Sequence, residues 1–230
     1  MRKGEAKSFS AGLRAEVEEL WRAQHQHPFV LAIGAGELDP ERFRYWVKQD
    51  YLFLVAYCRL LALAAARSPE QASLRRLAEL LNSTAVTEMS LHRQLAARLG
   101  LDEGELEGEE MSPTTQAYTD FLLRTAALGS FGELCSALLP CMWGFSELAL
   151  RLAQGARPAD PNLAAWIDSY SDPQFTSLAS WCRELVDRLA EDAGETTRAA
   201  MAAAFQLSSR YELAFWDAAW DLQEWRPAGG

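Results

Sequence analysis

Apolar residues recur at the three- and four-residue spacing of an α-helix along almost all of this 230-residue chain. Sustained alternation of apolar and polar residues, which would indicate strands, is absent. Helix-start signals, most of them a serine or aspartate before a proline or three residues before a glutamate, stand at Ser10, Asp39-Pro40, Ser68-Pro69-Glu70-Gln71, Ser112-Pro113, Ser130, Asp160-Pro161 and Asp172-Pro173. The expected stops are Gly100, Gly129, Gly155 and Gly194. This pattern predicts an all-α bundle of seven or eight helices.

The composition indicates one domain. A hydrophobic content of 49% in a chain of this length is enough for one sizeable core. No linker rich in proline or serine divides the chain. We therefore predict a single domain over residues 1–230, with residues 1–10 and 226–230 as flexible tails. The acidic stretch from Leu101 to Glu110 is expected to be a solvated loop without a chemical role.

The charge and the apolar segments argue against two classes of partner. The formal net charge is -10, and no basic cluster offsets it, which argues against nucleic-acid binding. The most apolar segment, Tyr51 to Ala66, contains Arg59 and is shorter than the roughly 20 residues of a membrane span, so it predicts a buried core helix. Residues 1–7 carry charges of both signs with no apolar run after them, which favours a cytoplasmic protein.

Pro140 and Cys141 lie inside the apolar helical pattern of Leu138-Leu139-Pro140-Cys141-Met142. A proline within a helix leaves one backbone carbonyl without its amide partner and bends the helix, here beside a thiol. An unpaired cysteine ordinarily only packs in the core, and this is our interpretation of the other three, Cys58, Cys135 and Cys182. The cysteines lack metal-type or redox-type spacing, so all four are expected to be reduced thiols. Cys141 is the candidate reactive cysteine.

Two acidic residues head apolar faces of predicted helices. Asp50 shares its face with Phe53, Leu54 and Tyr57, and Glu212 shares its face with Phe215, Trp216 and Trp220. Because a buried carboxylate is costly unless paired, Asp50 either makes a structural hydrogen bond or receives a polar ligand. Burial would raise the pKa of Glu212 and suit it to proton transfer near neutral pH. An ion pair with Arg210 is the structural alternative.

Tyr118 and Tyr170 offer hydroxyl groups and rings on two further helices, although single tyrosines of this kind usually only pack. Eight tryptophans and ten phenylalanines could stack a flat heterocycle, but most are expected to be core. The imidazoles are only His25, His27 and His92. Glu88 and His92 share a helix face at four-residue spacing, yet two ligands do not complete a di-iron site. We therefore expect no metal and no other cofactor, with a metal-dependent oxidase or haem protein as an alternative.

Five ordered segments resemble the TenA family, also called thiaminase II or aminopyrimidine aminohydrolases. They are His27-Pro28-Phe29-Val30, the stretch from Tyr45 to Leu54 around Gln49-Asp50-Tyr51, Leu138 to Trp143, Trp166 to Tyr170, and Tyr211 to Trp216. The resemblance spans nearly the whole chain. It implies a haem-oxygenase-like helical fold without haem, a homotetramer, and hydrolysis of an aminomethyl pyrimidine to the hydroxymethyl pyrimidine for thiamine salvage. It also implies that thiamine itself is a possible substrate.

The resemblance further implies roles for individual residues. Cys141 corresponds to the nucleophile, Glu212 to the acid and base, and Asp50 to the carboxylate that binds the pyrimidine. The implied lining residues are Phe53, Tyr118, Tyr170, Phe215, Phe145 and, more weakly, Tyr211. Where many relatives carry a tyrosine shortly after the cysteine, this chain has Gly144 and Phe145, which removes a hydroxyl from the pocket. A non-catalytic pyrimidine-binding or regulatory protein of the same fold is the main alternative.

Overall fold

The computed structural model describes residues 8–226, which form helices joined by short connections, with no strand among them. The helical segments are α1 (Phe9–Glu16), α2 (Glu18–His25), α3 (Pro28–Ala35), α4 (Pro40–Arg67), α5 (Gln71–Asn82), the π-helical η1 (Ser83–Glu88), α6 (Met89–Arg98), α7 (Glu103–Glu107), α8 (Pro113–Leu128), α9 (Phe131–Leu152), α10 (Pro161–Ser171), α11 (Pro173–Glu191) and α12 (Glu195–Asp221). The all-helical prediction is confirmed. The predicted number of helices is wrong, because short breaks and η1 divide runs that the apolar pattern joined.

Five of the seven predicted helix starts have the cap chemistry that the sequence indicated. The side chain of Asp39 accepts hydrogen bonds from the amides of Glu41 and Arg42, at 3.0 and 3.1 Å, just before α4. Ser130 and Glu133 form the reciprocal capping box at the start of α9. Aspartate or serine before proline also caps α8, α10 and α11. These caps satisfy amides that a helix start leaves without partners.

Two predicted start signals and one predicted stop are wrong. Ser68 ends α4 instead of capping α5, which begins after Glu70 without a side-chain cap. The first helix is capped by Ser8, so residues 8–10 are not a tail, and Ser10 is buried with its amide and hydroxyl bonded to Asp187. Gly194 caps the start of α12 and does not end α11. Residues 1–7 and 227–230 of the predicted tails lie outside the described residues.

The acidic stretch from Leu101 to Glu110 is not a loop throughout. It contains the short helix α7, whose start is a capping box between Asp102 and Glu105. Leu101 and Leu106 are buried and anchor the stretch to the core. The expectation of a wholly solvated segment was wrong because two leucines hold an otherwise acidic stretch against the protein.

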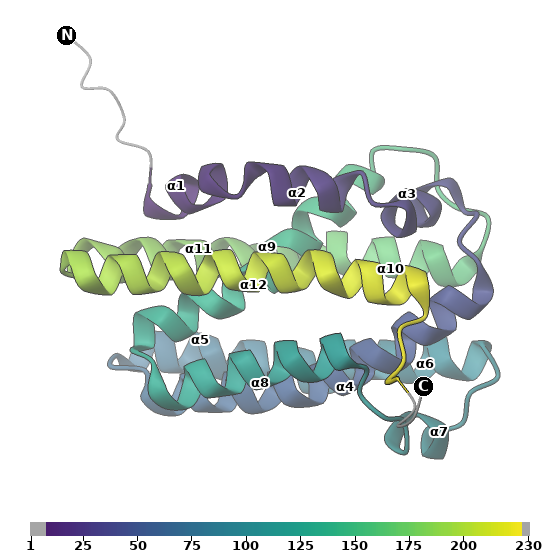
Figure 1. Ribbon diagram of the computed structural model, residues 1–230, viewed down its shortest axis with the longest axis horizontal. Helices are drawn as coiled ribbons and strands as arrows, with labels where there is room; N and C mark the ends of the chain where they lie inside the picture. The colour runs from purple at the N-terminus through teal and green to yellow at the C-terminus, as the bar shows by residue number, and fades with distance from the viewer. Residues whose placement is uncertain (1–7, 227–230) are drawn as a thin grey trace, which may run out of the picture.

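The helices form layers that enclose one core (Figure 1). In Figure 1, α1 to α3 lie along one side, α9, α11 and α12 run through the middle, and α4 and α8 lie along the opposite side. Helix α9 packs most extensively against α12 and α11, and α4 packs against α5 and α8. The site described below therefore draws its side chains from helices on both sides of α9.

Helix α4 is the one segment among residues 8–226 that is long and apolar enough to span a membrane by length and composition. At 28 residues it is longer than the predicted segment, so the argument from shortness was wrong. Its most apolar window is 56% buried inside the protein, and Leu60, Leu61 and Ala64 have no exposure. This burial is that of a core helix in a folded domain.

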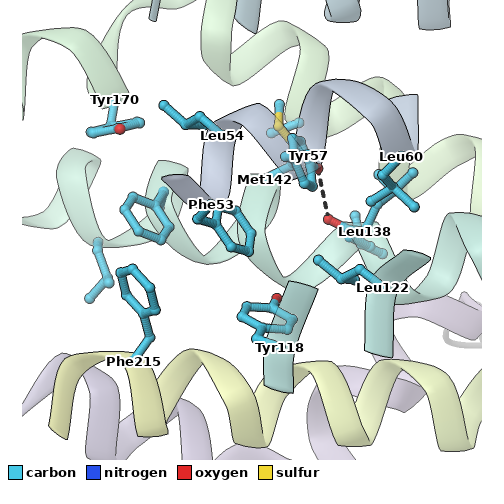
Figure 2. Packing of buried hydrophobic residues seen from close by; sticks show 14 of the residues in the cluster. Phe53, Leu54, Tyr57, Leu60, Tyr118, Leu122, Leu138, Met142, Tyr170 and Phe215 are labelled. Carbon is cyan, nitrogen blue, oxygen red and sulfur yellow. Dashed lines mark hydrogen bonds between the residues drawn. The ribbon is translucent and has the colours of Figure 1, made fainter. Parts of the chain in front are cut away.

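Helix α9 runs continuously through Pro140, which cannot donate to the carbonyl of Ser136. The next two carbonyls accept hydroxyl groups from other helices. Ser208 of α12 donates to Ala137 O at 2.7 Å, and Tyr57 of α4 donates to Leu138 O at 3.2 Å, as Figure 2 shows for Tyr57. The segment around Pro140 is therefore tied to both neighbouring helices immediately before Cys141.

Candidate functional site

A narrow cavity lies between α4, η1, α9, α10 and α11. Five of the predicted site residues line it, and they are Asp50, Phe53, Cys141, Phe145 and Tyr170. Its open volume is about 10 Å³, which holds about one water molecule. A planar heterocycle therefore needs its walls to move apart before it can enter.

Tyr118, Glu212 and Phe215 do not line the cavity directly but lie behind Phe53. The Phe53 ring centroid is 5.1 Å from that of Tyr118 and 5.9 Å from that of Phe215 (Figure 2). Tyr118 Oη in turn lies 2.5 Å from Glu212 Oε1. Phe53 thus contacts both the cavity and the rings of this second layer, while the charge of Glu212 still acts on the Cys141 thiol at the cavity wall.

Tyr211 lies outside the cavity. It is half-buried and stacks on Tyr118, with ring centroids 5.2 Å apart, and on Phe121. This position supports the Tyr118 ring from behind. The resemblance implied that Tyr211 lines the pocket, but in the structure Tyr211 does not line the cavity.

Cys141 is half-buried and faces the cavity from the turn of α9 that follows Pro140. Burial, and after it the negative charge of Glu212, raise the pKa of this thiol well above its usual range. The thiol is therefore protonated at rest near neutral pH. A reaction that uses its sulfur as a nucleophile needs a partner that takes the proton as the bond forms.

Glu212 is 3% exposed, and burial raises its pKa to about 8. It forms no ion pair within residues 8–226, and Arg210 is exposed, so the predicted structural alternative is wrong. The charge of Asp50 also raises the pKa of Glu212, whereas the Tyr118 hydroxyl opposes the shift. A carboxyl with this pKa can both give and accept a proton near neutral pH.

Asp50 pairs with a residue that sequence reasoning had considered only beside Glu88. His92 Nε2 of α6 lies 2.6 Å from Asp50 Oδ2, and both side chains are almost completely buried. The other ring nitrogen of His92 lies 3.0 Å from the backbone oxygen of Glu88. Burial lowers the pKa of His92, but Asp50 and Glu88 together outweigh burial and the pKa is raised. The structure therefore places Asp50 at the cavity wall with an imidazole behind it whose protonated form it favours.

Removing His92 should leave the Asp50 carboxylate buried without this partner. We expect His92→Phe to lower the free energy of unfolding by about 3 kcal/mol or more, the usual cost of breaking a buried pair from one side. Denaturant unfolding at pH 7 measures this. The double variant with Asp50→Asn should recover part of the loss, because no charge then remains unpaired. A single variant as stable as the parent would show that the pair contributes nothing.

Tyr170 presents a polar group to the cavity. Its hydroxyl is buried, lies beside the carboxyl of Glu88, and makes no hydrogen bond of regular geometry with another described residue. Burial, and then the charge of the neighbouring Glu88, raise the pKa of this phenol well above its usual range, so it remains a donor. A buried hydroxyl at a cavity wall without a well-formed hydrogen bond is suited to a polar ligand.

Sequence reasoning missed Glu88 as a wall of the site, together with Leu54, Tyr57, Met142 and Phe175. Glu88 ends the π-helical segment η1, and burial raises its pKa to about 7. π-Helical turns are frequent at functional sites, but the pattern of apolar residues does not reveal them. The available signal in the sequence was the four-residue spacing of Glu88 and His92, which is typical of a hydrogen-bonded or salt-bridged pair as well as of metal ligands.

The described residues contain no group of three or more histidine, cysteine, aspartate or glutamate side chains that could hold a metal ion. His25 and His27 lie away from the cavity and face Glu147 and Asp217. The polar side chains that line it are a thiol, two carboxyls and two phenols, of which that of Tyr57 is already bonded to Leu138 O. This set is suited to acid, base and nucleophilic chemistry on an organic molecule.

An outer groove adjoins the inner cavity. Glu88 and Phe175 line both, and the groove has a volume of about 360 Å³. Phe175 is half-buried and packs edge-on against Tyr170, with ring centroids 5.3 Å apart. The shared residues lie between the surface groove and the cavity that Cys141 lines.

Phe175→Ala should open a passage from the groove to the cavity. We expect iodoacetamide to alkylate Cys141 several-fold faster in the variant, because the ring no longer covers the passage from the groove. Peptide mass spectrometry measures alkylation at each cysteine separately. Cys58, which is half-buried and does not line the cavity, provides an internal reference whose rate should stay constant. An unchanged Cys141 rate would place the entrance elsewhere.

The fold and the site define an all-helical protein with an enclosed small-molecule site built around a thiol and carboxyl groups. The TENA/THI-4/PQQC family model matches residues 14–222, and the chain belongs to this family. An aminopyrimidine aminohydrolase from Halalkalibacterium halodurans is 36% identical over 96% of this chain and 100% of its own length.

Solved structures agree with this assignment. A TenA homologue from P. horikoshii OT3 has a TM-score of 0.86 at 29% identity, over 93% of this chain and 99% of that one. A heme oxygenase-like domain from Shewanella denitrificans has a TM-score of 0.72 at 14% identity, over 92% and 91% of the two chains, and shows the fold alone. The predicted family and the haem-oxygenase-like fold are confirmed.

Proposed function

We propose that this protein is an aminopyrimidine aminohydrolase of the thiaminase II type. Its reaction would convert 4-amino-5-aminomethyl-2-methylpyrimidine and water to the hydroxymethyl pyrimidine and ammonia. The observation that carries the proposal is the convergence of Cys141, Asp50 and the buried Tyr170 on one enclosed cavity, with the Glu212 carboxyl close enough to raise the pKa of the thiol. The likeness to a relative of this name over nearly its full length supports the proposal.

The first step joins the sulfur to the ring. Asp50 and Tyr170 hold the amino and ring nitrogens of the pyrimidine, and the rings of Phe53 and Phe145 form its apolar walls. As Cys141 Sγ bonds to a ring carbon, Glu212 gives its proton to a ring nitrogen and receives the thiol proton in exchange. The adduct is neutral, and Glu212 is again protonated.

The second step exchanges ammonia for water. Electrons from the adduct expel the amine, which takes the Glu212 proton as the carbon–nitrogen bond breaks. Water then adds to the methylene carbon and returns a proton to Glu212. Finally the carbon–sulfur bond breaks, the sulfur takes the proton from Glu212, and the ring nitrogen gives its proton back to that carboxylate. The thiol and the carboxyl end in their starting states.

Phe145 distinguishes this site from the tyrosine-bearing pattern described above. It is 6% exposed and packs against Tyr170 and Trp216, with ring centroids 5.0 and 5.2 Å away. The wall at this position therefore has no hydroxyl with which to bind a substrate. This difference bears on the choice between the aminomethyl pyrimidine and thiamine, while the reaction itself depends on other residues.

The proposed activity is tested by incubating purified protein with the aminomethyl pyrimidine and, separately, with thiamine. We expect ammonia and hydroxymethyl pyrimidine to form from the first compound in equal amounts. Folded protein that binds the compound without releasing ammonia would favour a non-catalytic binding or regulatory protein. The homotetramer and the cytoplasmic location remain predictions, which size-exclusion chromatography with light scattering and cell fractionation would test.

A further inference from the structure

Three short contacts join Glu212 to the backbone of α9. Glu212 Oε1 lies 2.5 Å from Tyr118 Oη, Tyr118 Oη lies 2.8 Å from Ser208 Oγ, and Ser208 Oγ lies 2.7 Å from Ala137 O. Tyr118 and Glu212 are almost completely buried, and Ser208 has no exposed surface. Water is therefore excluded from the chain of contacts, and its members must satisfy one another.

The number of protons in this chain depends on the state of Glu212. The oxygen of Ala137 can only accept, and each hydroxyl supplies one proton. With Glu212 ionised, Tyr118 and Ser208 supply two protons for three contacts, so one pair of oxygens faces each other without a hydrogen. With Glu212 protonated, the carboxyl donates to Tyr118, Tyr118 to Ser208, and Ser208 to Ala137 O. Only the protonated form completes all three hydrogen bonds.

We propose that Ser208 is a positioning residue that orients this chain so that Glu212 stays protonated before substrate binds. Its catalytic meaning rests on the proposed function, because a protonated Glu212 is what the first step needs in order to give a proton to the ring. Ser208 does not line the cavity and acts through Tyr118. Neither the resemblance nor the apolar pattern had singled it out.

The surroundings of Glu212 favour the same state. The titratable groups that act on it or feel its charge are Asp50 and Tyr57 of α4, Tyr118 of α8 and Cys141 of α9. All of these are neutral or negative, and the described residues place no cation among them. Burial already raises the pKa of Glu212 to about 8. The hydrogen-bond chain favours the protonated form of Glu212 in addition to burial, because it is complete only when the carboxyl donates a hydrogen bond to Tyr118.

The experiment measures the protonation state of the Glu212 carboxyl in the protein without substrate. Infrared spectra of protein labelled with ¹³C-glutamate, recorded against pH, report the protonated and ionised carboxyl bands, and Glu212→Gln identifies the contribution of this residue. We expect Ser208→Ala to lower the midpoint of that titration by about 1 pH unit, since the protonated form loses two hydrogen bonds and the ionised form loses only one. The measurement needs no substrate, so it remains interpretable if ammonia release fails.

Three further variants distinguish the loss of the hydrogen-bond chain from a general loss of packing around α12. Ser208→Thr keeps the hydroxyl and should keep the midpoint. Ser209→Ala removes a buried hydroxyl from the next position of α12, where it accepts from Trp21 instead, and should not move the midpoint. Tyr118→Phe removes the partner of Glu212 in either state and should raise the midpoint, because the ionised form loses the stronger bond.

The direction in which each variant shifts the Glu212 titration midpoint tests the proposal. A lower midpoint for Ser208→Ala together with a higher midpoint for Tyr118→Phe supports the ordered chain. An unchanged or higher midpoint for Ser208→Ala overturns it. So does an equal shift in Ser209→Ala, because the effect would then be a response to lost packing in α12. Should Ser208→Ala fail to fold, a midpoint for Tyr118→Phe at or below the parent value overturns the proposal and a higher one supports it.

Discussion

Cys141→Ser is expected to reduce ammonia release from the aminomethyl pyrimidine on the order of a thousandfold or more while leaving the fold intact. A serine hydroxyl is a much weaker nucleophile than a thiol near neutral pH, and the site holds no stronger base than Glu212 to activate it. The substitution changes the side-chain volume only slightly, and Cys141 has no hydrogen bond that the fold requires. Steady-state kinetics and the far-ultraviolet circular dichroism spectrum measure the two parts of this result.

Cys58→Ser is the matched control for that experiment. Cys58 is also half-buried, lies on α4, and does not line the cavity. Its replacement should leave the turnover rate within about twofold of the parent. Turnover by Cys141→Ser at a rate close to that of the parent would exclude covalent catalysis by this sulfur, and the aminohydrolase activity would then need a direct attack by water.

The fold was predictable because its signals are local. Aspartate before proline, or serine with a glutamate three residues on, caps a helix through atoms within one turn, so the sequence alone locates the starts of α4 and α9. Two of the errors occur where a contact with a residue distant in the sequence, or burial in the core, determines the local structure. Ser10 is held by Asp187, and the acidic stretch is anchored by Leu101 and Leu106. No pattern within a few residues contains that information.

The candidate site was predictable in part for the same reason. The helical spacing identified Asp50 and Glu212 as inward-facing carboxyls, since an apolar stripe fixes which face of a helix is buried. It could not identify their partners. His92 reaches Asp50 from α6, and Ser208 reaches Tyr118 across α8 and α12, so both contacts depend on how helices pack. The position of Tyr211 behind Tyr118 could not be derived for the same reason.

Glu212→Gln should slow turnover by a factor of about 10² to 10⁴, the usual contribution of a positioned acid or base, with little change in substrate affinity. Glutamine is close in shape to the protonated carboxyl, and its amide can donate to Tyr118 as that carboxyl does. The hydrogen-bond chain to Ser208 is therefore kept while proton transfer is lost. Measured kcat and KM separate the two effects, and an unchanged kcat would remove Glu212 from proton transfer.

Glu212→Gln should also change how the free energy of unfolding depends on pH. The pKa of Glu212 is about 8 in the folded protein and about 4.5 when unfolded, so between these pH values the folded state binds one more proton than the unfolded state. The free energy of unfolding should therefore fall with rising pH in this window, by about 1.4 kcal/mol per pH unit from this residue.

The interval from pH 7 to 8 gives the cleanest comparison. Glu88, with a pKa of about 7, adds a similar slope at lower pH, and His92 contributes equally to the parent and to Glu212→Gln. Denaturant unfolding of both proteins across this interval isolates the Glu212 contribution as the difference between two slopes. We expect the variant to lose less stability than the parent as the pH rises. Parallel slopes would mean that Glu212 is already ionised in the resting protein, and the carboxyl could then act first only as a base.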